Sequence, residues 1–151
     1  MQIYNLKDNI KFLEEVAILE YEEWADNQEE NKKERINKKI DIIKEKLNDS
    51  DFCKLILVDN NKLIGFISIF PQDCKECKDL RPWYATMYVK KEYRNKGYSK
   101  LLNDAILKEA AKRGYKEIYL KTTLINYYEK FGAKLIKILE NKERIYKFEL
   151  I

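Results

Sequence analysis

The residues best suited to bind an anion lie between positions 87 and 102, where a basic loop joins an apolar segment to an amphipathic one. Gly97 lies where a helix is expected to begin. The first turn of a helix leaves unpaired N–H groups at the positive end of the helix dipole, and glycine lets a ligand oxygen approach them closely. A pyrophosphate would fit this corner, although these features alone do not say which phosphate ligand it binds. Five basic residues add positive charge within eleven positions, with Glu92 the only acid among them: Lys90, Lys91, Arg94, Lys96 and Lys100.

The chain contains no histidine, and this absence excludes several kinds of chemistry. Ser-His-Asp and Cys-His machinery and His-based zinc sites are ruled out. Cys74 and Cys77 form a CxxC pair, but a structural zinc needs four ligands and only Cys53, in an apolar segment, remains. We therefore expect two reduced loop thiols, a core Cys53 and no metal. Acid–base chemistry must come from carboxylates, Tyr, Lys, Cys or water.

Two motifs resemble those of GNAT acetyltransferases. The Walker A and GxGxxG patterns are missing. Residues 94–99, Arg-Asn-Lys-Gly-Tyr-Ser, are instead similar to the GNAT signature [Q/R]xxGx[G/A], with Ser99 in place of the usual Gly or Ala. Residues 127–133, Tyr-Tyr-Glu-Lys-Phe-Gly-Ala, are similar to the family's [F/L]YEKxGF, with Ala133 replacing a bulky residue. The resemblance covers residues 50–148 well and the first fifty loosely.

The resemblance implies acetyl-CoA as cosubstrate. In this family pantetheine lies along a splayed strand, here Met87-Tyr88-Val89, so backbone groups of Met87 and Val89 are expected to bond its amides and the thioester carbonyl. Asn126 is a further candidate for the pantetheine arm, and Tyr128 matches the tyrosine that protonates the leaving thiolate, unless it only packs on the sheet. The pyrophosphate would rest on the N–H groups of a run of five residues, with the Arg94 and Lys96 side chains nearby: Asn95, Lys96, Gly97, Tyr98 and Ser99.

The resemblance also implies direct attack of an amine on the thioester. The strand expected at 83–89 carries no carboxylate, so no general base can be named. Polyamines, amino sugars, amino acids and protein N-termini all remain open as acceptors. Four carboxylates are candidates for the base by proximity alone: Glu22, Glu23, Asp79 and Glu92. Four aromatic residues either wall the acceptor pocket or pack in the core: Tyr21, Trp24, Trp83 and Tyr84.

The 151 residues fit one domain, spanning 1–151, with 45% hydrophobic and 37% charged residues. The patterns predict an α/β fold with a mixed central sheet of six to seven strands, helices on both faces and a C-terminal β-hairpin. The resemblance implies that this is the GNAT fold. Asn60-Asn61 predicts a tight hairpin, and Asn27 a helix cap. Strands are expected at 3–6, 52–58, 63–70, 83–89, 117–121, 135–139 and 144–150. Helices are expected from 8 or 9 to 24, and at 28–47, 97–113 and 127–131.

The net charge of +4 is spread over a mixed surface. The apolar runs are too short to span a bilayer, and the N-terminus lacks a signal-peptide pattern. These features predict a cytoplasmic monomer or homodimer that binds neither membrane nor nucleic acid. Two alternatives remain: a CoA-binding protein of this fold without catalysis, and a nucleic-acid-binding domain that uses the basic residues at 90–100.

Overall fold

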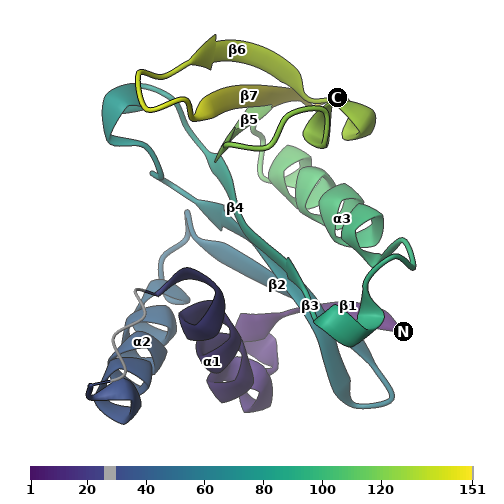
Figure 1. Ribbon diagram of the computed structural model, residues 1–151. Helices are drawn as coiled ribbons and strands as arrows, with labels where there is room; N and C mark the ends of the chain where they lie inside the picture. The colour runs from purple at the N-terminus through teal and green to yellow at the C-terminus, as the bar shows by residue number, and fades with distance from the viewer. Residues whose placement is uncertain (26–29, 151) are drawn as a thin grey trace.

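A computed structural model describes residues 1–25 and 30–150. Its centre is a seven-stranded mixed sheet in the order β1-β2-β3-β4-β5-β7-β6, flanked by helices (Figure 1). All neighbouring strands are antiparallel except the parallel pair β4 and β5. The strands are β1 (Gln2–Asn5), β2 (Cys53–Asp59), β3 (Lys62–Phe70), β4 (Trp83–Val89), β5 (Glu117–Thr122), β6 (Lys134–Ile138) and β7 (Arg144–Glu149). The helices are α1 (Leu13–Trp24), α2 (Lys32–Lys46) and α3 (Tyr98–Lys112).

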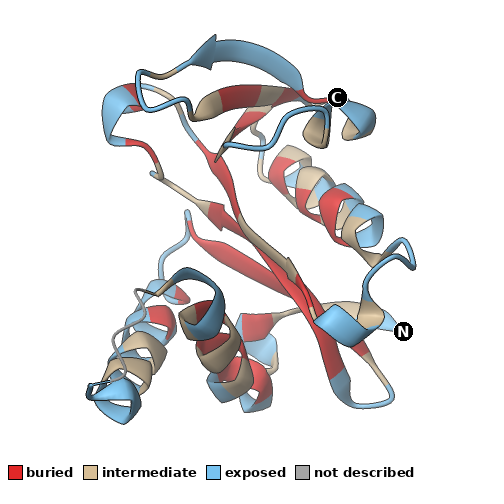
Figure 2. Ribbon diagram, in the orientation of Figure 1, coloured by how far each residue is buried: buried red, intermediate tan, exposed pale blue. Residues whose placement is uncertain are grey.

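The core has a layer on each face of the sheet. Helices α1 and α2 cover one face, and α3 covers the other (Figure 1). The inner strands are buried along most of their length, whereas each helix buries only one side (Figure 2). On the α3 face, Leu102, Ile106 and Ala110 pack against the sheet, and on the opposite face Val16 and Ala17 do so. The predicted arrangement of helices on both faces is confirmed.

Strands β4 and β5 separate soon after they pair. Their one ladder pair joins Trp83 to Tyr119. Farther along β4 a bulge shifts the register with β3, because Phe66 lies opposite Tyr88 while Ser68 lies opposite Ala85. Beyond this pair, the sides of β4 and β5 that face each other have no strand partner, although β4 still pairs with β3 and β5 with β7. The candidate site lies there.

Local turn chemistry explains several boundaries. Asn60 and Asn61 adopt φ values of 51° and 62°. A two-residue type I′ hairpin turn requires positive φ at both of its central residues, so the predicted β2–β3 hairpin is confirmed. The first strand ends at Asn5, whose side chain accepts a hydrogen bond from the Lys7 N–H. Helix α1 begins at Leu13, so the predicted start at residue 8 or 9 is wrong, because two short 3₁₀ turns, Leu6–Asp8 and Ile10–Phe12, precede it.

Three further predictions concern the start of α2, the segment at 127–131 and the C-terminal hairpin. Helix α2 begins at Lys32, and the predicted helix start at residue 28 and its cap at Asn27 lie outside the described residues. The predicted helix at 127–131 is a 3₁₀ turn, Tyr128–Phe131, which ends at Gly132 with φ of 98°. The C-terminal hairpin is present, with β7 between β5 and β6. In the described ranges, no helix is long and apolar enough to span a bilayer.

Candidate functional site

The predicted anion corner lies at the N-terminus of α3. Gly97 occupies the N-cap position with φ of 83°, and Asn95 also has a positive φ, of 63°. A Cβ atom at Gly97 would meet nothing within 4 Å, so the backbone here faces open space. This corner opens into a cavity of about 550 Å³. We call it the corner cavity, and it is lined by Met87, Val89, Tyr93, Arg94, Asn95, Gly97, Tyr98, Ser99, Lys100, Tyr127, Lys130 and Phe131.

The corner cavity collects most of the predicted cosubstrate residues. Lys96 is exposed beside the cavity and does not line it. Tyr88 points to the other face of the sheet, where its ring stacks on Phe66 with 5.4 Å between centroids. Asn126 is also exposed and does not line the cavity, and its N–H donates to Glu129 at 3.4 Å. The backbone geometry therefore brings Met87, Val89 and the loop together and leaves the side chains of these three residues outside.

Positive charge surrounds the corner, but several cations have partners. The Arg94 Nε donates to the Val89 carbonyl at 2.8 Å, so this carbonyl already accepts one bond. Lys130 Nζ lies 4.2 Å from the centre of the Tyr127 ring. Lys100 pairs with Asp104 at 2.8 Å. Of these three cations, Lys100 alone has its charge offset by a carboxylate in the described part of the chain.

A second cavity of about 520 Å³ lies where β4 and β5 separate. Met87 lines both this cavity and the corner cavity, and the adjacent Tyr127 and Tyr128 line one each. The two cavities are therefore neighbours across the splayed strands. We call this second one the splay cavity, and it is lined by Glu23, Trp24, Asp73, Tyr84, Ala85, Thr86, Met87, Leu120, Lys121, Thr122, Leu124, Tyr128 and Glu143.

Tyr128 lies in a largely apolar setting at the junction of the cavities. Its ring meets Tyr84 edge-on, with 5.7 Å between centroids. Tyr84 is held in turn by a hydrogen bond from its hydroxyl to Asn103 Oδ1 at 2.8 Å. Burial raises the pKa of Tyr128 to about 12, with a smaller contribution from Tyr127. The phenol is therefore protonated at neutral pH and can donate a hydrogen bond.

Carboxylates line the splay cavity. Of the four carboxylates proposed from the sequence, Glu23 lines it, whereas the other three do not. Asp73 and Glu143 also line it, and sequence reasoning missed them because they lie in connecting segments far apart in the chain. Burial raises the pKa of Asp73, and the charge of Lys121 opposes that shift. Lys121 Nζ also donates to the Asp73 backbone carbonyl at 2.8 Å.

The four aromatic candidates divide between pocket wall and core. Trp24 and Tyr84 line the splay cavity, and Trp24 is 49% exposed. Trp83 is fully buried and donates from Nε1 to the Leu80 carbonyl at 2.9 Å, so it is a core residue and not a pocket wall. Tyr21 lines a separate cavity between α1 and α2.

The cysteines are buried free thiols. Cys74 and Cys77 lie at either end of a short 3₁₀ turn, and burial raises the pKa of Cys74 to about 11. Within residues 1–25 and 30–150, no three His, Cys, Asp or Glu side chains are grouped so that they could hold a metal.

Comparison with known proteins identifies the family. Residues 12–133 match the acetyltransferase (GNAT) family. The chain belongs to this family.

Individual relatives place the chain among several acetyltransferases. It is 34% identical over 82 residues to N-alpha-acetyltransferase 30 of Schizosaccharomyces pombe, a match covering 51% of this chain and 54% of that protein. The chain thus spans about half the length of this curated relative. An aminoglycoside 6'-N-acetyltransferase complexed with coenzyme A has the same fold, with a TM-score of 0.77 and 20% identity over 100% of this chain and 98% of that one. The PaiA N-acetyltransferase of Thermoplasma acidophilum, also in complex with coenzyme A, has the same fold, with a TM-score of 0.71. Its sequence is 23% identical to this chain, and the match covers 99% of both chains.

Proposed function

We propose that residues 1–151 form one N-acetyltransferase domain that moves an acetyl group from acetyl-CoA to an amine by direct attack. The observation that carries this proposal is the junction of the two cavities. A corner of open backbone lies on one side of the splayed strands, and a cavity with a protonated phenol lies on the other. Met87 borders both, so one extended ligand can reach from the corner to Tyr128.

The corner suits a pyrophosphate. Gly97 leaves open space over the first turn of α3, and the N–H groups that follow it are free to meet oxygen atoms. The side chains of Arg94 and Lys130 add positive charge at the cavity wall. The free edge of β4 beyond the bulge would bind the amide-rich pantetheine arm, because unpaired strand groups need partners.

Tyr128 would act at the departing sulfur. With a pKa of about 12, the phenol is a weaker acid than a thiol, whose usual pKa is about 8.5. It therefore cannot simply give up its proton and remain ionised. We assign to it a hydrogen bond to the developing thiolate, with any proton it gives replaced from the attacking nitrogen in the same step.

The acceptor would be an amine that carries further positive charge. Three carboxylates and one lysine line the splay cavity, so the charge of its wall favours cations: Glu23, Asp73, Glu143 and Lys121. The exposed Trp24 offers an aromatic face on which a cationic group can lie. Polyamines and amino sugars meet both requirements.

Two assays test this proposal. Saturating acetyl-CoA should raise the melting temperature, because a ligand that binds only the folded state stabilises it. Thiol release from acetyl-CoA should then respond to spermidine and kanamycin more than to a neutral peptide of one free amine. Stabilisation without thiol release from any amine would favour a CoA-binding protein without catalysis. No stabilisation would refute the corner as a CoA site.

A further inference from the structure

A row of buried polar side chains crosses the face of the sheet that α1 and α2 cover. Lys54 on β2 is 1% exposed, and its ammonium group is bonded by residues from three other elements. Lys54 Nζ lies 3.1 Å from Glu20 Oε1 on α1, 2.6 Å from Ser68 Oγ on β3 and 3.2 Å from Thr86 Oγ1 on β4. The two hydroxyl oxygens are 2.5 Å apart. Burying this set is costly unless every member is bonded, and Glu20 Oε2 has no partner among the described residues.

The bulge in β4 brings Thr86 into this row. Thr86 has φ of 50°, in the left-handed region that β-branched residues rarely occupy. The bulge lies where β3 and β4 shift register, between the pairs that Ser68 and Phe66 make. Such strain persists where the surroundings hold it, and it is concentrated at functional sites.

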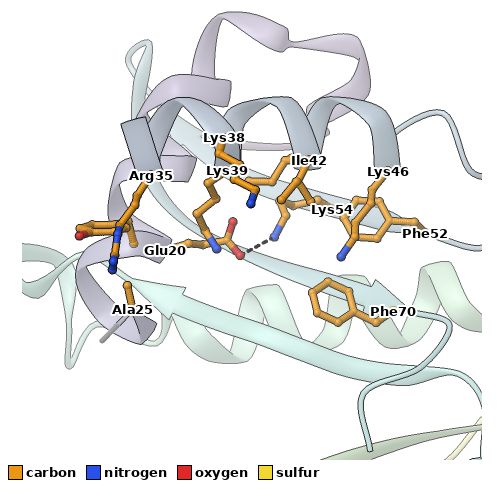
Figure 3. Close-up of a pocket in the computed structure, with 12 residues that line it drawn as sticks. Glu20, Ala25, Arg35, Lys38, Lys39, Ile42, Lys46, Phe52, Lys54 and Phe70 are labelled. Atoms are coloured by element: carbon orange, nitrogen blue, oxygen red, sulfur yellow. Dashed lines mark hydrogen bonds and ion pairs between the residues drawn. The ribbon is translucent and has the colours of Figure 1, made fainter. Parts of the chain in front are cut away.

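The row connects two cavities. Thr86 lines the splay cavity, where the amine is proposed to bind. Lys54 and Glu20 line a different cavity of about 400 Å³ between α1, α2 and the ends of β2 and β3. Figure 3 shows the contact between Lys54 and Glu20 in that cavity, with several basic side chains of α2 around it.

We propose that Thr86, Ser68 and Lys54 relay a proton from the acceptor amine, with Lys54 as the general base and Glu20 as its outlet to the cavity beyond. This inference rests on the proposed acetyl transfer and supplies the base that the sequence does not reveal. Thr86 is the catalytic residue that contacts the amine. Ser68, Lys54 and Glu20 act through it.

The proton balance is as follows. The acceptor enters as an ammonium group and gives one proton to Thr86 Oγ1. In the same step the hydroxyl proton of Thr86 moves to Ser68 Oγ, and the hydroxyl proton of Ser68 moves to the lone pair of neutral Lys54. The freed amine attacks the acetyl carbon, a C–N bond forms, and the C–S electron pair leaves with sulfur. The second nitrogen proton goes to the sulfur by way of Tyr128. The proton on Lys54 leaves through Glu20, so each turnover yields amide, free thiol and one proton in solution.

The surroundings of Lys54 act on its pKa in both directions, and burial is the largest effect. Burial lowers its pKa, and the charges of Lys39 and Lys46 on α2 act in the same direction. Glu20 opposes the shift by its charge and its hydrogen bond. Ser68 and Thr86 face Lys54 without charge. Three rings also surround it at 5.2–6.0 Å, those of Phe52, Phe66 and Phe70, and their faces favour the ammonium form. Because the relay needs neutral Lys54, turnover should rise as pH rises through the pKa of Lys54.

A matched pair of variants tests the relay with acetyl-CoA and spermidine as substrates. Thr86→Val keeps the shape and the β-branched backbone preference but removes the hydroxyl, and kcat should fall about a hundredfold or more. Thr86→Ser keeps the hydroxyl and should recover most of the lost turnover. A wild-type kcat in Thr86→Val would overturn the relay.

A second test addresses the base. Lys54→Met alone would leave Glu20 buried and unpaired, so the variant is made together with Glu20→Leu, which removes both charges. The double variant should fold, bind CoA and lose the rise of kcat with pH. If Asp73→Asn removes that rise instead, Asp73 is the base and the relay is wrong.

A third test is independent of the acceptor. In a protein labelled at the lysine ε carbon, the NMR signal of Lys54 should titrate below the signals of the exposed lysines. Titration together with them, near 10.4, would refute Lys54 as the base. If the wild-type protein releases no thiol with any amine, both the proposed function and the relay are refuted. Turnover that is insensitive to Thr86 refutes the relay alone.

Discussion

Replacing Gly97 by alanine and by glutamate separates backbone strain from charge at the proposed pyrophosphate site. Either side chain would project into open space, since a Cβ there meets nothing within 4 Å. Both must also adopt φ of 83°, which costs an L residue about 1–2 kcal/mol. The two variants should therefore lose similar stability, and each 1 kcal/mol lowers the melting temperature of a chain this size by about 2–4 °C.

Their affinities for CoA should differ, because only the glutamate adds negative charge. At a separation of about 6 Å and an effective dielectric constant of about 50, each phosphate charge is repelled by about 1.1 kcal/mol. Two phosphate charges give about 2 kcal/mol. The dissociation constant of CoA should therefore be about thirtyfold higher for Gly97→Glu than for Gly97→Ala.

Isothermal titration calorimetry with CoA measures this difference directly. Repeating the titration at about 1 M salt, where charges are screened within about 3 Å, should reduce the gap. Equal dissociation constants at low salt would refute the reasoning, since the pyrophosphate would then lie away from Gly97. A gap that does not change with salt would point to steric exclusion in place of charge.

The remaining predictions concern the phenol, the thiols and the packing of the sheet. Tyr128→Phe should lower kcat without changing CoA affinity, and because the pKa of Tyr128 is about 12, wild-type kcat should show no loss from its ionisation below about pH 11. Replacing both Cys74 and Cys77 by serine should leave thiol release from acetyl-CoA unchanged and reduce urea stability, because both side chains are buried. Gly65→Ala should destabilise the fold by about 1–3 kcal/mol in urea unfolding, since its Cβ would lie 2.4 Å from a backbone oxygen of β4. Burial raises the pKa of Cys53 from 9.0 to about 11, so its contribution to stability is present below pH 9 and is lost as pH rises toward 11. Cys53→Val should remove that part of the alkaline loss in urea unfolding at a series of pH values.

The sequence predicted those features that depend on short stretches of chain. The Asn60-Asn61 turn and the glycine before α3 are set by residues next to them, and both are found as expected. The position of Trp83 was not predictable in the same way, because an aromatic residue on a strand can face either a cavity or the core. Its burial is decided by Tyr119 and Leu80, which come together with it only in the fold.

The polar row could not be predicted for a related reason. In the sequence, Lys54 is one cation within an apolar segment, and Thr86 is one β-branched residue within another. Their contact depends on the register of β2, β3 and β4, and a strand whose register shifts by one residue turns each side chain to the opposite face. A bulge changes that register at one place, and the sequence 83–89 contains no glycine that would mark it.

The same bulge ties the two halves of the proposed reaction together. Met87 packs toward the α3 face and lines the corner cavity, whereas the preceding Thr86 bonds to side chains under α1 and α2. Cosubstrate and proton relay would thus meet at adjacent residues on opposite faces of one strand. A change in the side chain at position 86 should alter turnover and leave CoA affinity unchanged. A change that removes the bulge would turn both residues at once, and should therefore reduce CoA affinity and turnover together.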